Sequence, residues 1–182
     1  MTGLLPKLRS HVRAWLRRED GNSTIGFVIV FPIFLVLFMA AFEIGMFAVR
    51  QTVLDRAVDV TVRAIRLGQM VNPDHDTIKE TICNNAPSLP NCDETLKVNL
   101  VRVATTTWTL PNDATSCHDR ALPLNPVGEV DPNPQARQVL MLMRVCYIAD
   151  AIFPGGEIAT RLQQDGAGGY QMFASTAFLN EP

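Results

Sequence analysis

The sequence predicts an α+β fold, in which a long N-terminal transmembrane-plus-amphipathic helix packs on a small antiparallel β-sheet. An apolar run extends from Ile25 to Val49, with Glu43 as its only charge. Residues 51–66 then place apolar side chains at helical intervals, and Gly68 follows as a typical helix end. The rest of the chain alternates apolar, β-branched segments with stretches rich in Pro, Gly, Asn and Asp, as a small sheet domain does.

The apolar run is long enough to cross a membrane. At the rise of an α-helix it covers roughly 35 Å, more than a hydrocarbon core of about 30 Å. Two other interpretations, a buried helix of a soluble protein and a cleavable secretory signal, fit less well because the run is too long and begins too late. The predicted parts are a basic leader (1–21), a membrane span (22–50), an amphipathic extension (51–70) and an extracytoplasmic domain (71–182).

Charge and cysteine position predict the orientation of the span. The leader is basic, as a cytoplasmic flank is expected to be, and it forms either a helix on the inner leaflet or an unstructured tail. All cysteines follow the span: Cys83, Cys92, Cys117 and Cys146. An even set in a small domain favours disulfides outside the cytoplasm, although reduced thiols stay an alternative. Of three possible pairings, the simplest is Cys83–Cys92 with Cys117–Cys146.

Two residues inside the span stand out. Pro32 interrupts the helical hydrogen bonds, which membrane helices tolerate as a kink, and it is also a candidate for contact with another helix. Glu43 is costly in lipid unless it is paired, protonated or near the headgroups. It either reaches outward to the interface or contacts a partner helix.

The remaining residues predict one helix and three strands. The second helix is expected to start at Asn72-Pro73, with Asn72 as its cap and with Ile78 and Ile82 facing inward. Loops and turns are expected over 111–135, at Gly155-Gly156 and over 165–169. The expected strands are 96–110, 139–148 (apolar on both faces, as a central strand is) and 170–179.

No pattern of catalytic residues emerges from the sequence. The motifs of metalloproteases, serine hydrolases and phosphate-binding loops do not occur. Asp74-His75-Asp76 is interpreted as a solvated helix start, and Cys117-His118 as a disulfide cysteine beside a histidine. Trp108 is interpreted as a packing residue. We therefore expect no enzyme, no cofactor and no metal site, and the net charge of −2 argues against nucleic-acid binding. An envelope thiol oxidoreductase would require reactive, unpaired thiols.

An ordered combination of segments resembles a known family. A leader ending in Arg17-Arg18-Glu19-Asp20-Gly21 is followed by a span containing FVIVFPIFLVLF, by Phe42-Glu43-Ile44-Gly45, by LDRAVDVTVRAIRLG and finally by Asn180-Glu181-Pro182. Together these segments resemble the TadE/TadF-like (TadE/TadG-like) proteins of Tad, or Flp, pilus assembly systems. The resemblance is clearest over residues 17–70.

The resemblance implies a pseudopilin or minor pilin of the bacterial inner membrane, with its C-terminal domain in the periplasm. Its partners would be the membrane, other pilin helices, pilus assembly proteins and a prepilin peptidase. That peptidase would cut after Gly21 and make Asn22 the new N-terminus. The family's glutamate at the fifth mature position is replaced by Gly26. This departure leaves open an uncleaved, membrane-anchored binding module, and Gly21 itself could equally belong to an ordinary juxtamembrane turn.

Overall fold

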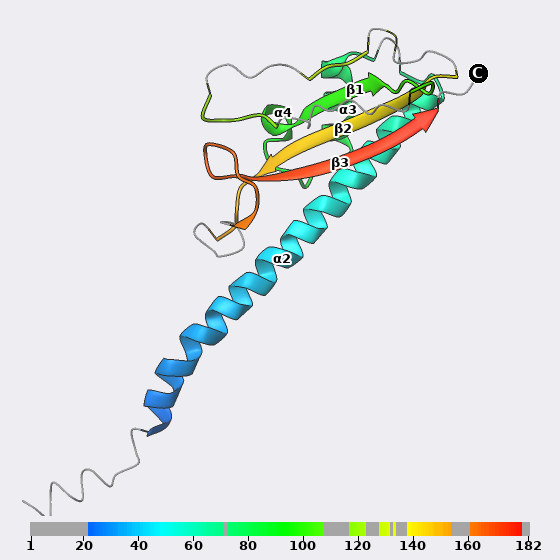
Figure 1. Cartoon of the computed structure of the whole chain (residues 1–182). Coiled ribbons are helices and arrows are strands. Elements are labelled where there is room, and N and C mark those ends of the chain that lie inside the picture. The colour runs from blue at the N-terminus through cyan, green and yellow to red at the C-terminus, as the bar shows by residue number, and fades with distance from the viewer. Residues whose placement is uncertain are drawn as a thin grey trace, which may run out of the picture. The chain divides into compact units, whose positions relative to one another are not determined.

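A computed structural model describes residues 22–70, 73–107, 117–122, 128–131, 133, 138–153 and 161–179. The chain divides into two compact units, Met1–Ala41 and Phe42–Pro182. The second unit contains a three-stranded sheet with helices on one face (Figure 1). The described elements are α2 (Asn22–Arg66), α3 (His75–Asn84), α4 (Cys92–Thr95), β1 (Lys97–Arg102), β2 (Leu140–Ala149) and β3 (Tyr170–Leu179).

α2 is one continuous helix of 45 residues, as its apolar and then amphipathic pattern predicts. It ends in a Schellman motif, where Gly68 adopts a φ of +66°. The Gly68 amide donates to the carbonyl of Ile65, and the Gln69 amide donates to that of Ala64. These bonds satisfy carbonyls that the end of a helix leaves without partners, and glycine adopts the required backbone at little cost.

The sheet is antiparallel with the strand order β1-β2-β3, which makes β2 central. Odd-numbered β2 residues, such as Met143 and Val145, face the helices, and even-numbered ones, such as Leu142 and Cys146, face the other side. Both sets are buried apart from Leu140 and Arg144, which are partly exposed. A strand that is covered on both faces is mostly apolar, which explains the VLMLMRVCYI pattern, with Arg144 as its one charged residue.

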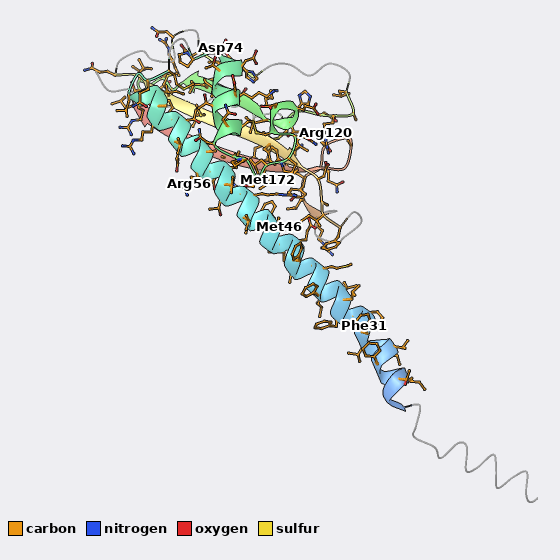
Figure 2. All side chains as sticks on the ribbon, turned by 180° about the vertical axis from the view of Figure 1, so that it is seen from behind. Phe31, Met46, Arg56, Asp74, Arg120 and Met172 are labelled. Carbon is orange, nitrogen blue, oxygen red and sulfur yellow. A yellow bond between two sulfur atoms is a disulfide. The ribbon has the colours of Figure 1, made fainter. Side chains whose placement is uncertain are left out.

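The core lies between the sheet and two helices. The helices contribute five side chains that are each at most 2% exposed: Leu54, Val58 and Ile65 of α2 and Ile78 and Ile82 of α3. Figure 2 shows α2 and α3 on the same face of the sheet. The α+β architecture predicted from the sequence, a long N-terminal helix with a small antiparallel sheet, is therefore confirmed for the residues that the structure describes.

Two predicted boundaries were wrong. The first strand ends at Arg102 rather than 110, because its partner strand begins at Leu140 and offers nothing to pair with further residues. α3 is capped by Asp74, whose carboxylate accepts the Thr77 amide at 2.8 Å, and not by Asn72. Asp74 lies directly before the first helical residue, where a carboxylate can reach the free amides of the first turn. Asn72 itself, Trp108 and the Gly155-Gly156 turn lie outside the described residues.

Candidate helix-packing site

The residues expected to mark the leader cleavage belong to the start of α2. Asn22 is the first helical residue, whereas Gly21 lies outside the described residues. At Gly26, no heavy atom lies within 4 Å of the position that a Cβ would occupy. Packing in this chain therefore does not require a glycine there, and a carboxylate side chain would have room.

The apolar half of α2 presents its side chains outward. Large apolar residues from Ile25 to Phe38 are 38% to 65% exposed. Aromatic pairs one turn apart cover part of this surface. The rings of Phe27 and Phe31 lie 4.9 Å apart (Phe31 is labelled in Figure 2). By length and composition, this helix is the one candidate membrane span in the described part of the chain. An apolar surface of this size requires either lipid or other helices around it.

Pro32 lies within this surface, and α2 continues through it as helix. Proline has no amide hydrogen, so the carbonyl four residues earlier loses its usual donor. In a membrane, neighbouring groups can satisfy such a carbonyl. The contact of Pro32 with another helix stays a prediction.

Glu43 is buried within the second unit, with 5% of its surface exposed. Its carboxylate accepts the amides of Ile152 and Phe153 at 3.1 Å each. The ring of Phe153 also packs edge-on against Phe42, at a centroid distance of 6.1 Å. The loop after β2 therefore supplies the partners that a buried carboxylate needs. Contact with a partner helix, one of the two roles expected for Glu43, is not needed to satisfy its charge.

Arg50 lies on the same face of α2 two turns later, and it binds the residues that follow β2 and that begin β3. Its Nη1 donates to the carbonyl of Asp150 at 2.9 Å and to the Tyr170 hydroxyl at 2.7 Å. Phe47 packs against the Tyr170 ring at 5.6 Å. Burial raises the pKa of the Tyr170 phenol, although the neighbouring Arg50 cation acts in the opposite direction. Together Glu43 and Arg50 hold residues 150–153 to the helix at two levels about 10 Å apart.

A second polar cluster holds the turn before β3. The Arg120 guanidinium bridges the carboxylates of Asp150, at 2.8 Å, and Asp165, at 2.6 Å. Asp165 also accepts the amides of Ala167 and Gly169. Burial opposes ionisation of Asp165, but hydrogen bonds from Arg120 and these amides outweigh it and hold the pKa below its usual value. A Cβ on Gly169 would clash with Arg120 and Ile148, so glycine is needed where the turn meets this cluster.

Two disulfides close the domain, Cys83–Cys92 and Cys117–Cys146. These are the pairs favoured from the sequence. Cys117 therefore has no free thiol beside His118. His75 approaches the neighbouring carboxylate of Asp76 at 3.0 Å. Among the described residues, no group of three or more His, Cys, Asp or Glu side chains could hold a metal ion.

No motif in the sequence marks Arg50, Tyr170, Arg120 or Asp165 as functional residues. A signal existed for the arginine, which follows Glu43 by two helical turns and continues the face that carries Leu54. Asp165 precedes Gly-Ala-Gly-Gly, a composition typical of a turn in which an aspartate accepts nearby amides. The partners of both residues lie far away in the sequence.

Comparison with known protein families gives a match to one segment of the chain, which lies mostly in α2. A family model described as "TadE-like protein" matches residues 21–63, which include most of α2. No curated protein and no solved structure matches the chain. The matched segment falls within the residues that carried the resemblance, so the resemblance is confirmed there. Residues 21–63 are thus similar to TadE-like proteins.

Proposed function

We propose that the protein is a TadE-like minor pilin or pseudopilin of a Tad (Flp) type pilus, which acts by packing its apolar helix against other pilin helices. One observation carries the proposal: the TadE-like segment includes an apolar helical surface that nothing else in the described chain buries. In the membrane, lipid covers such a surface. In a fibre, the same surface packs against neighbouring helices.

The proposed orientation places the domain from Phe42 onward in the periplasm of a bacterial inner-membrane protein. The basic leader favours a cytoplasmic N-terminus. Both cysteine pairs of the domain form disulfides, which persist in oxidising compartments. The leader and the domain thus support the same orientation independently of each other.

Gly26 favours a second candidate function, a permanent membrane anchor whose domain binds pilus or secretion components. In the family, a glutamate at this position of the processed chain is thought to pair with the terminal amine of a neighbouring subunit. Gly26 offers no carboxylate, and its surroundings leave room for one. A chain that is never cut after Gly21 would have no use for that glutamate.

Processing distinguishes the two functions. We would measure the intact mass and N-terminal sequence of the protein recovered from its native membrane. A chain that begins at Asn22 supports the minor pilin. A chain that retains residues 1–21 contradicts processing and supports the anchor.

A matched pair of variants tests whether helix packing matters. Gly26→Glu restores the family's carboxylate, and Gly45→Glu places the same side chain at another helical glycine with nothing within 4 Å of its Cβ position. If the protein enters the fibre, Gly26→Glu should raise its amount in sheared pili, and Gly45→Glu should not. Equal amounts for both variants would contradict a specific role for the position.

A further inference from the structure

We propose that the open edge of β3 binds an extended segment of a different protein chain as a fourth strand, and that this segment carries an acidic side chain where it passes Arg63. The inference concerns the domain and does not depend on leader processing. In Figure 1, β3 is the last strand of the sheet.

The hydrogen bonds of the sheet establish which groups of β3 point outward. The carbonyl of Leu140 accepts the amide of Val103 at 2.9 Å. The backbone amides and carbonyls of the even-numbered β2 residues therefore point toward β1. The backbone groups of odd-numbered β2 residues therefore bond to those of even-numbered β3 residues. The backbone amides and carbonyls of the odd-numbered β3 residues point away from β2, toward the open side of the edge. In agreement, the Phe173 carbonyl accepts the Gln51 side chain at 2.9 Å. The residues beyond it whose amides and carbonyls point outward are Ser175, Ala177 and Leu179.

This edge has none of the features that usually prevent a strand from pairing. Proteins protect exposed edges with charges, prolines, bulges or short strands. β3 has ten residues, and none of them is charged or a proline. Among the described residues, nothing pairs with the outward backbone groups of Ser175, Ala177 and Leu179.

The opposite edge of the sheet is different. On β1, the Leu100 amide donates to Glu129 at 2.7 Å, and the Leu100 carbonyl accepts the Asp131 amide at 2.8 Å. That edge is therefore occupied around Leu100, which prevents repeated edge-to-edge stacking of copies of the domain. Only β3 is free to accept a strand in the described part of the sheet.

A groove of about 500 Å³ runs beside this edge. On the β3 side it is lined by Thr176, Ala177 and Phe178. On the other side it is lined by Asp59, Val62, Arg63 and Arg66 of α2 and by Leu67, which directly follows α2. On the opposite face of β3, Phe173 is 44% exposed and Leu179 is 51% exposed. An added strand would thus place alternate side chains in the groove and beside these two apolar residues, which is how strand addition acquires specificity.

A second copy of this chain fits the edge poorly. Gln51 contacts Phe173, and Arg63 lines the groove with Phe178, so α2 and β3 run in the same direction. Antiparallel pairing of two β3 edges would therefore direct the two α2 helices oppositely, although both enter one membrane from the same side. Parallel pairing of two β3 edges requires a half-turn about an axis parallel to the strands, so a symmetric pair would set each outward residue level with its own copy. A parallel ladder instead bonds each outward residue to two residues that lie above and below its level. A different chain avoids both problems, and a carboxylate on it would meet the Arg63 side chain in the groove.

The experiment uses the full chain in lipid nanodiscs and a fluorescein-labelled peptide of alternating valine and threonine that ends in aspartate. Binding is measured by fluorescence anisotropy, and the exchange of the Ser175, Ala177 and Leu179 amides is measured with and without peptide. Ala177→Pro removes one outward amide and no bond to β2, and Ala177→Val is its matched control. A peptide methylated on alternate backbone nitrogens tests the wild-type chain in the same way.

We expect the peptide to protect the three amides, and Ala177→Pro to weaken binding about tenfold while Ala177→Val does not. Replacing the terminal aspartate by lysine should weaken binding about two- to fivefold, and Arg63→Gln should remove this difference. Equal binding of the methylated peptide, or no protection of the three amides at millimolar peptide, overturns the proposal. A disulfide-linked dimer of the Ala177→Cys chain in its native membrane would overturn the choice of partner, because it would place a second copy on the edge.

Discussion

Removing the Glu43 carboxylate should release the loop after β2 from α2. In Glu43→Ala, the amides of Ile152 and Phe153 lose their acceptors. Arg50 still holds the carbonyl of Asp150, so the loop should open locally without unfolding the domain. The expected result is faster hydrogen exchange at these two amides, with core amides such as that of Met143 unchanged.

The size of the effect follows from the two hydrogen bonds. A hydrogen bond to a charged group contributes about 1.5–3 kcal/mol. Ile152 and Phe153 are only half-buried, so water recovers part of the loss, and we estimate about 2–4 kcal/mol for the pair. At about 1.4 kcal/mol for each factor of ten, exchange should accelerate roughly 30- to 1,000-fold. Glu43→Gln keeps one carbonyl oxygen and should show a smaller acceleration.

The assay is amide exchange followed by NMR on the full chain in nanodiscs. Glu80→Ala is the control, because it makes the same chemical change on an exposed position of α3. If Glu43→Ala changes the exchange of Ile152 and Phe153 by less than about threefold, the carboxylate does not hold the loop and our interpretation of the site is wrong.

Three further predictions concern the domain. Asp165→Asn should lower the melting temperature at neutral pH. The difference from wild type should begin to shrink as the pH falls below the ordinary carboxyl value of 3.8 and should be lost below the depressed pKa of the folded state, because the charged carboxylate is the form that stabilises the fold. Replacing Cys117 and Cys146 by serine should cost about 3–4 kcal/mol in chemical unfolding, because their disulfide closes a long loop. Gly68→Ala should cost about 1–2 kcal/mol in the same assay, because its φ of +66° strains any residue with a Cβ.

Each of these predictions has an outcome that contradicts it. A pH-independent difference for Asp165→Asn would show that the lost hydrogen bonds, and not the charge, stabilise the turn. Unfolding at the wild-type denaturant concentration after loss of the disulfide would mean that the unfolded loop is already constrained. For Gly68→Ala, the control is Gly45→Ala, which lies within α2 at an ordinary helical φ and should be neutral or slightly stabilising.

Much of the fold could be predicted because its determinants are local. Apolar spacing specifies α2 up to Gly68, and the glycine specifies its end. Apolar residues on both faces identified β2 as the central strand before any pairing was known. The end of β1 could not be predicted in this way. Thr105–Thr107 has high β-propensity, yet these residues form a turn because β2 begins at Leu140 and leaves them without a partner strand.

The candidate site divides in the same way. The sequence by itself determined that α2 is apolar enough for a membrane, that Gly26 stands where the family has an acid, and that Glu43 needs a partner. Only the tertiary structure decided that this partner is the backbone of Ile152 and Phe153, more than 100 residues away in the chain. It also decided that, among the residues described, nothing pairs with the outward backbone groups of Ser175, Ala177 and Leu179. Helical periodicity depends on residues that are close together in the sequence. The partner of a buried charge depends on which distant segment of the chain packs beside it.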